Sequence, residues 1–473
     1  VFTAGGCFDE MGFENPNFEL TPFEIVLSNS LDDLLWAYLN GETFEATDVR
    51  GNNVLHYACR NNSELMCRGL LALATDLELW NRENEYGQRP SDLTTSKSIV
   101  TMIQVFQEGK PGSPFGSTWE TNLALAKQKI DVPSTEIDDE RVLWSLDGGG
   151  VRGIVEIQML LHIERLLGFP LDRVVDWIGA TSLSAFTAMS IGQGKSLREI
   201  HREFLEMAQR SFSQPGPHKI PKYSLREVEE EMRSKLEFKT LASLKKRVFI
   251  PMADIESYPV KQVNFRSYMP IGSCSANQVY LNPGLTSQWK AGLIACCNPV
   301  FFSPCGRLVD GSLFTPNPSA ALLTDFFRFQ KYDQLKGREN NDRVYAVISL
   351  GCGTNPANYN FAANKIQSFT ELDLASVLRK KAHVVSQFIQ QAGNSDGPTA
   401  EFAVELAHSH RAPFIRVQPK LDDQFAFDDV RHATIVNLLY ETEKQLRTSL
   451  APQVDLIVEI LRRLRTKRTV VLH

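Results

Sequence analysis

The stretch VLWSLDGGGVRGI (residues 142–154) combines a strand, a glycine-rich loop and the start of a helix. VLWSL is mostly apolar, and the three glycines that follow it interrupt regular structure. An apolar helical pattern then runs from about residue 153 to about residue 168. This order is typical of a strand–loop–helix unit in a parallel sheet, where functional sites lie at the carboxyl ends of the strands.

The same alternation continues along the chain. Further strands are predicted at residues 174–179, 246–255, 262–269, 343–351 and 413–419, and a helix from about residue 183. Apolar strands that alternate with helices predict a mostly parallel sheet covered on both faces. We therefore expect an α/β fold over residues 141–450.

Composition restricts the class of protein. The chain has 473 residues, 43% of them hydrophobic and 22% charged, so it can form several globular domains. A net charge of −6 gives no general attraction to nucleic acid, and we expect no such partner. No apolar run approaches the roughly 20 residues of a membrane helix, and no signal-peptide pattern opens the sequence.

The eight cysteines form no C-x-x-C pair and show no zinc-site spacing with histidines. They are typical of reduced, buried thiols, which predicts a cytoplasmic protein. We expect any contact with a membrane to be peripheral.

Three similar stretches occupy residues 1–107. They begin TPFE at residue 21, NVLHYA at residue 53 and RPSDL at residue 89, at steps of 32 and 36. These steps are close to the ankyrin period of about 33 residues, and the middle copy resembles the ankyrin core. We expect a small helical stack that either supports the rest of the chain or binds a protein partner, with His56 in a structural role.

The remaining segments are assigned from composition. Residues 108–140 contain several glycines and prolines before a polar stretch, which predicts a linker. Residues 451–473 predict a basic amphipathic helix with two alternative roles. It packs on the domain, or it binds anionic lipid or a calmodulin-like partner.

Three interpretations of the glycine loop can be compared. Gly148, Gly150 and Gly153 match the dinucleotide-binding pattern G-x-G-x-x-G, but Asp147 would repel a pyrophosphate there. Successive glycine N–H groups could instead form an oxyanion hole at a helix start. In the third interpretation the loop is a tight turn, Asp147 caps the helix and Arg152 lies on the surface.

Two further motifs carry candidate chemistry. In DWIGATS (residues 176–182) a short strand runs into a small-residue corner, and Ser182 occupies the position expected of a serine nucleophile. In VDGS (residues 309–312) Asp310 lies in an Asp-Gly-Ser turn after an apolar segment.

Taken together, these motifs resemble the patatin-like phospholipases, and in particular their ankyrin-containing calcium-independent branch. The resemblance covers residues 141 to about 450 and rests on DGGGVRG, DWIGATS, the segment ending PVFF at residue 302, VDGS and SLGCGT (residues 349–354). It implies a three-layer α/β/α catalytic domain that hydrolyses phospholipid acyl esters at a membrane surface. It also implies a serine–aspartate dyad that uses no metal or cofactor.

The resemblance assigns roles to individual residues. Ser182 would be the nucleophile, Asp310 the base, and the N–H groups of Gly148, Gly149 and Gly150 the oxyanion donors; Arg152, Gly153, Ala180, Ser184 and Gly311 would support the motifs. Sequence order also permits a Ser-His-Asp triad, because His383, His408, His410 and His432 all follow Asp310.

The serine corner departs from the family pattern. Ala180 and Ser184 replace glycines two residues before and after Ser182, and Ser312 replaces a Gly or Ala. Because a sharp corner brings these positions close together, we expect crowding that a glycine at each would relieve. The alternative to an active hydrolase is therefore a weak or inactive relative that acts as a lipid-binding or ankyrin-mediated scaffold. Oligomer formation is compatible with either.

Overall fold

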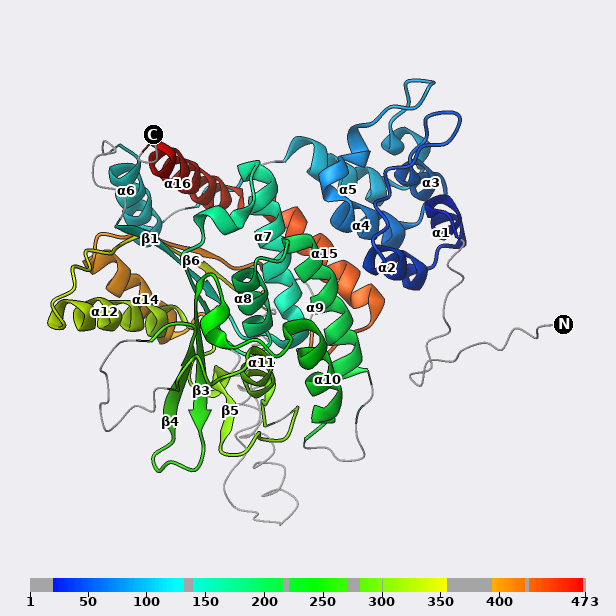
Figure 1. Cartoon of the computed structure of the whole chain (residues 1–473). Coiled ribbons are helices and arrows are strands. Elements are labelled where there is room, and N and C mark those ends of the chain that lie inside the picture. Colours follow the sequence, from blue (N-terminus) through cyan, green and yellow to red (C-terminus); the bar gives the residue numbers. More distant parts are fainter. Residues whose placement is uncertain are drawn as a thin grey trace, which may run out of the picture. The chain divides into compact units, whose positions relative to one another are not determined.

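The computed structural model describes residues 20–470 apart from residues 110, 115, 132–138, 214, 216–220, 270–280, 300, 355–393 and 422–424 (Figure 1). The chain divides into two compact units. The first comprises Val1–Lys110 and Arg431–Thr448, and the second Pro111–Val430 and Ser449–His473.

The second unit is built on a seven-stranded sheet. Its strands are β1 (Glu140–Leu146), β2 (Trp177–Ala180), β3 (Arg247–Asp254), β4 (Lys261–Arg266), β5 (Leu308–Asp310), β6 (Arg343–Leu350) and β7 (Phe414–Val417). The order is β4-β3-β2-β1-β6-β7, and β5 pairs with β3 outside this path. β4 and β5 are antiparallel to β3, and the other neighbours are parallel. The predicted mostly parallel sheet is confirmed.

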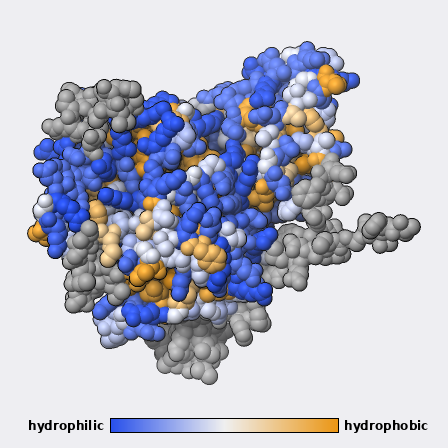
Figure 2. Space-filling model, in the orientation of Figure 1, coloured by the Kyte–Doolittle hydropathy of each residue, from blue (hydrophilic) through white to orange (hydrophobic). Residues whose placement is uncertain are grey.

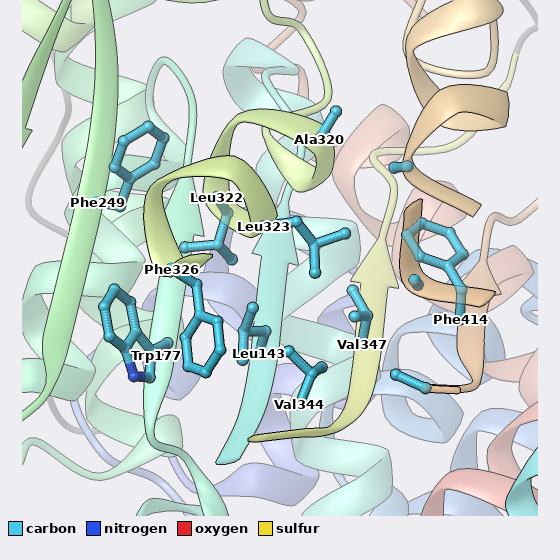
Figure 3. Packing of buried hydrophobic residues seen from close by; sticks show 13 residues of the cluster. Leu143, Trp177, Phe249, Ala320, Leu322, Leu323, Phe326, Val344, Val347 and Phe414 are labelled. Atoms are coloured by element: carbon cyan, nitrogen blue, oxygen red, sulfur yellow. The ribbon is translucent and has the colours of Figure 1, made fainter. Parts of the chain in front are cut away.

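Helices lie on both faces of this sheet. Between β1 and β7 the described residues form α7 (Ile154–Leu167), α8 (Ser184–Gln193), α9 (Leu197–Phe212), α10 (Leu225–Leu236), α11 (Gln288–Cys296), α12 (Ser319–Leu335) and α14 (Pro398–Ser409). Figure 1 shows α12 and α14 on one side of the sheet and α7, α8 and α9 on the other. In Figure 3 the α12 residues Leu322, Leu323 and Phe326 meet the strand residues Leu143, Trp177 and Val347, all buried. Because burial of these side chains fixes the strands, the loops at their carboxyl ends have a rigid support.

The predicted linker contains a helix. Within residues 108–140 the structure has α6 (Ser117–Asp131), whose Asn122 and Ala126 are buried. The side-chain oxygen of Asn122 accepts hydrogen bonds from the N–H of Phe414 (2.7 Å) and from Nε2 of His408 (2.8 Å). The linker prediction was wrong for this part, because a composition argument does not detect a buried polar residue that pairs with a distant strand.

The first unit is helical. Its helices are α1 (Pro22–Ser28), α2 (Leu31–Leu39), α3 (Val54–Arg60), α4 (Glu64–Leu73), α5 (Lys97–Glu108) and α15 (His432–Leu446). α15 packs on α4, and Thr75 donates a hydrogen bond to Glu443 (3.0 Å). Residues 431–448 follow the predicted catalytic domain in the chain and were expected to belong to it. The structure instead places them in the N-terminal unit.

Two loops of the first unit repeat the same geometry. A side-chain oxygen of Asp48 accepts from the backbone N–H groups two and four residues later (both 2.8 Å), and Asn84 does the same (both 3.0 Å). His56 contacts both regions: its Nδ1 accepts from the N–H of Asn53 (3.1 Å), and its Nε2 lies 3.0 Å from the carbonyl oxygen of Gln88. The structural role expected for His56 is therefore confirmed.

The C-terminal helix α16 (Ala451–Val470) packs within the second unit, against α6 and α7. The apolar residues that define its amphipathic pattern are all buried: Leu456, Ile457, Ile460, Leu461 and Leu464. The face of the molecule in Figure 2 is largely hydrophilic with small hydrophobic areas. Over the residues described, we find no helix with the length and apolar character needed to cross a bilayer.

Candidate active site

Ser182 occupies a sharp corner between β2 and α8. Its φ angle is +59°, a left-handed conformation that is costly for a residue with a Cβ atom. The preceding N–H, that of Thr181, donates to the carbonyl of Leu146 (3.2 Å), so β1 supports the corner. Ser182 is half-buried, and its neighbours in the corner are buried. This strand–corner–helix arrangement is the one that exposes a serine hydroxyl at the end of a sheet.

Asp310 ends β5, opposite Met252 of β3. The N–H of Ser312 donates to its Oδ1 (2.8 Å), which forms the predicted turn. Its Oδ2 is buried and has no hydrogen-bond partner among the described residues. Burial raises the pKa of Asp310 to about 6, while the N–H of Ser312 and the hydroxyl of Ser182 oppose that rise. Ser182 and Asp310, 128 positions apart in the sequence, are thus neighbours.

Gly311 follows Asp310 at a point of close approach to β3. A Cβ atom on Gly311 would lie only 2.2 Å from the carbonyl oxygen of Pro251. Only glycine therefore allows this turn to bring Asp310 into the sheet edge.

The glycine loop lies directly against the serine corner. A Cβ atom on Gly148 would be 3.3 Å from Cβ of Ser182 and 3.4 Å from Cβ of Ser312. The N–H of Gly148 donates to the carbonyl of Pro316 (2.8 Å) and is therefore already bonded. This bond connects the loop to the segment after the Asp310 turn, and it occupies the N–H group that was expected to serve as an oxyanion donor. Gly148 instead provides space beside Ser182.

Gly149 and Gly150 retain the predicted donor groups. Their N–H groups donate to no acceptor in the part of the chain that the structure describes. A Cβ atom on Gly149 would lie 2.3 Å from Sγ of Cys352, and one on Gly150 would lie 2.3 Å from the carbonyl oxygen of Phe427. These contacts require glycine at both positions.

Asp147 does not cap the helix after the loop, as one interpretation proposed. Its Oδ2 accepts a hydrogen bond from Arg416 of β7 (2.6 Å), which also donates to Ser349 (2.7 Å). Burial raises the pKa of Asp147 to about 6, and the attraction of Arg416 opposes that rise. Asp147 and Arg416 therefore form a buried ion pair beneath the glycine loop.

Arg152 is buried and does not lie on the surface, the other expectation of that interpretation. Its guanidinium carbon is 3.9 Å from the centre of the Phe427 ring. A Cβ atom on Gly153 would be 2.8 Å from the ring of Phe204 and 3.2 Å from Oγ of Ser184. Gly153 therefore allows the start of α7 to lie close to α9 and α8.

The two departures from the family pattern are accommodated differently. Ala180 is a buried residue of β2 that pairs with Leu146, and its methyl group is part of the core. Ser184 is also buried, and its Oγ donates to Oε2 of Glu156 (2.6 Å). The hydroxyl that we expected to crowd the corner therefore has a specific partner.

The candidate triad histidines are bonded elsewhere. His408 contacts Asn122, His410 stacks on Phe327, and His432 pairs with Asp32 of the first unit. His383 lies outside the described residues. The Ser182 hydroxyl is instead a hydrogen-bond partner of the Asp310 carboxyl group, and the contacts of the three described candidates, His408, His410 and His432, lie elsewhere.

Comparison with known proteins agrees with this geometry. Residues 144–323 match the model of the patatin-like phospholipase family. Over these residues the resemblance to that family is confirmed. Its members are serine acyl hydrolases. The matched segment contains the glycine loop, the serine corner and the Asp310 turn.

Individual relatives are similar over longer stretches. An intracellular phospholipase A2 of Caenorhabditis elegans is 24% identical over 455 residues, or 86% of this chain and 41% of that protein. The 85/88 kDa calcium-independent phospholipase A2 of Mus musculus is 25% identical over 336 residues, or 68% of this chain and 41% of that protein. A cGAMP-activated phospholipase of Vibrio cholerae is 26% identical over 236 residues, or 44% of this chain and 64% of that protein. The match thus spans about two fifths of the length of the first two relatives.

Proposed function

We propose that this protein is a calcium-independent phospholipase that releases free fatty acid and lysophospholipid from glycerophospholipids at a membrane surface. The observation that carries the proposal is the pairing of Ser182, in a left-handed conformation, with the buried carboxyl group of Asp310. The patatin-like family and the phospholipase A2 relatives support the substrate class.

In the proposed reaction Asp310 takes the proton of the Ser182 hydroxyl as its oxygen attacks the acyl carbonyl. The N–H groups of Gly149 and Gly150 stabilise the negative charge that develops on the carbonyl oxygen. Asp310 then returns the proton to the leaving lysophospholipid oxygen. In the second step Asp310 activates water, which hydrolyses the acyl-Ser182 ester and regenerates the free hydroxyl.

The raised pKa of Asp310 predicts the acid limb of the pH profile. Only the ionised carboxylate can accept the serine proton, so kcat/KM is expected to rise about tenfold per pH unit below about pH 6 and to level off above it. Hydrolysis of a water-soluble ester, measured from pH 4.5 to 8, checks this. A profile that stays flat down to pH 4.5 would show that Asp310 is not the base.

Calcium dependence provides a second test. The dyad and the glycine N–H groups need no bound cation for proton transfer or charge stabilisation, so an excess of EGTA is expected to leave phospholipid hydrolysis unchanged. Release of fatty acid from phosphatidylcholine vesicles, with EGTA and with added Ca²⁺, checks this. Activity that EGTA abolishes and Ca²⁺ restores contradicts the mechanism.

We also propose that the first unit is an ankyrin-like module that binds a protein partner. Its equivalent loops carry exposed apolar side chains, Val49 (92% exposed) and Tyr86 (67%). If this module were the whole function, Ser182→Ala would leave the cellular phenotype intact. A phenotype lost with a folded Ser182→Ala variant rejects that scaffold role.

Binding of a calmodulin-like partner to α16 would require that helix to expose its apolar side, which is buried in the structure.

A further inference from the structure

Glu156 is a carboxyl group buried directly behind the candidate site. It lies in the first turn of α7 and is inaccessible to solvent. Burial, reinforced by the charge of Asp147, raises the pKa of Glu156 well above its usual range. A buried carboxyl group is costly unless its oxygens are bonded, so the identity of its partners is informative.

The two oxygens of Glu156 bond to two different parts of the site. Oε2 accepts from Oγ of Ser184 (2.6 Å), and Oε1 accepts from the N–H of Asp147 (2.5 Å). Ser184 is two residues after Ser182, in the first turn of α8. Asp147 immediately precedes the glycine loop. A single side chain therefore connects the backbone that aims the nucleophile to the backbone that carries the oxyanion donors.

We propose that Glu156 is a positioning residue that sets the distance between the Ser182 hydroxyl and the N–H groups of Gly149 and Gly150. The inference rests on the proposed function. Attack on a carbonyl requires reacting atoms about 3–3.5 Å apart, and a displacement of about 1 Å can lower the rate about 10²-fold. Fixing both backbone segments to one buried group limits that displacement.

This proposal reverses the expectation for Ser184. From the sequence alone, a glycine at this position is expected to relieve crowding. In the structure, however, removal of the Ser184 hydroxyl would leave a buried oxygen of Glu156 without its partner. Ser184→Gly is therefore expected to slow the reaction.

The test compares three variants with wild-type protein. Glu156→Leu removes both hydrogen bonds, whereas Glu156→Gln can keep them, because its amide oxygen accepts from Asp147 and its amide nitrogen donates to Ser184. Glu164→Leu is the matched control: Glu164 lies at the other end of α7 and accepts from the N–H of Leu171 (2.7 Å). Each protein is treated with a fluorophosphonate, and both the labelling rate of Ser182 and the final labelled fraction are recorded. kcat and KM are measured with p-nitrophenyl butyrate.

Glu156→Leu is expected to lower two quantities by about 10–100-fold: kcat, and the rate constant of labelling for those molecules that do label. KM should be unchanged. Glu156→Gln should stay within about threefold of wild type. Glu164→Leu should label at the wild-type rate. If Glu156 only stabilised the fold, Glu156→Leu would reduce the labelled fraction and leave the rate per labelled molecule unchanged, which overturns the inference.

Three further outcomes are decisive. If Glu156→Leu does not fold, Ser184→Ala removes one of the two bonds without adding volume, and an unchanged labelling rate in that variant overturns the inference. If wild-type protein labels and hydrolyses ester, and Glu156→Leu does both equally fast, the role of Glu156 is rejected but the proposed function is not. If folded wild-type protein never labels at Ser182, both the proposed function and the role of Glu156 are rejected.

Discussion

Asp310→Asn is expected to slow fluorophosphonate labelling of Ser182 by about 10²–10⁴-fold, the usual contribution of a general base. Asparagine keeps the size of the side chain, and its oxygen can still accept the hydrogen bond that the N–H of Ser312 donates to Asp310 (2.8 Å). It cannot take the serine proton. Ser182→Ala is expected to abolish labelling. Mass spectrometry of the modified peptide and the time course of labelling measure both effects.

The control is a second buried aspartate of the same sheet edge. Asp254 ends β3 and is bonded to Ser257 (2.9 Å) and Arg307, away from Ser182. Asp254→Asn is expected to label at the wild-type rate per folded molecule. Equal rates for folded Asp310→Asn and wild-type protein would rule out proton transfer to Asp310.

Arg416→Met is expected to lower the free energy of unfolding by about 3–5 kcal/mol, the usual effect of removing one partner from a buried ion pair. Asp147 is fully buried, and the guanidinium of Arg416 is its charged partner at 2.6 Å. Urea denaturation at pH 7.5 measures the loss. The double variant Asp147→Asn/Arg416→Met should recover part of it, because no carboxyl group is then left without its cation.

The same pair predicts how this loss depends on pH. Folding raises the pKa of Asp147 to about 6, so its stabilising contribution is complete below the unfolded-state pKa and decreases as the pH rises through 6. Without Arg416 the pKa rises further. The loss of unfolding free energy in Arg416→Met is therefore expected to be small at pH 5 and to grow towards pH 8.

Asp396→Asn is the control, because it removes the more exposed partner of Arg416. It should lower the free energy of unfolding by less than about 1 kcal/mol. A loss as large as that of Arg416→Met would show that Asp147 is not the critical partner.

Much of the fold could be predicted because its signals are local. The parallel strands of the second unit are short, mostly apolar runs bounded by turns, β4 alternates apolar and polar residues, and the loop after β1 has a distinctive glycine pattern. β5 has only three residues, too few to show a pattern. The membership of α15 in the first unit depends on contacts across more than 300 positions, such as that between Thr75 and Glu443. No pattern within either segment encodes that pairing.

The site was predictable where a motif specifies backbone geometry. Ser182, Gly149, Gly150 and Gly311 occupy positions that sharp turns or close contacts demand. The supporting charges were missed because their partners are distant in sequence. One feature of the sequence could have indicated Glu156: it is a charged residue inside the apolar helical stretch IVEIQMLL. A similar signal marks Arg416 within the apolar strand PFIRVQP.

The split first unit has a consequence for biosynthesis. Its last helix, α15, follows residue 110 by roughly 320 residues (431 − 110 = 321). At about 5–20 residues per second, a ribosome needs roughly 16–64 s to make that interval. Throughout that time the nascent helices α1 to α5 lack the helix that packs on α4, and the second unit has most of its chain available. The N-terminal unit is thus completed late in translation, although it is the first to emerge.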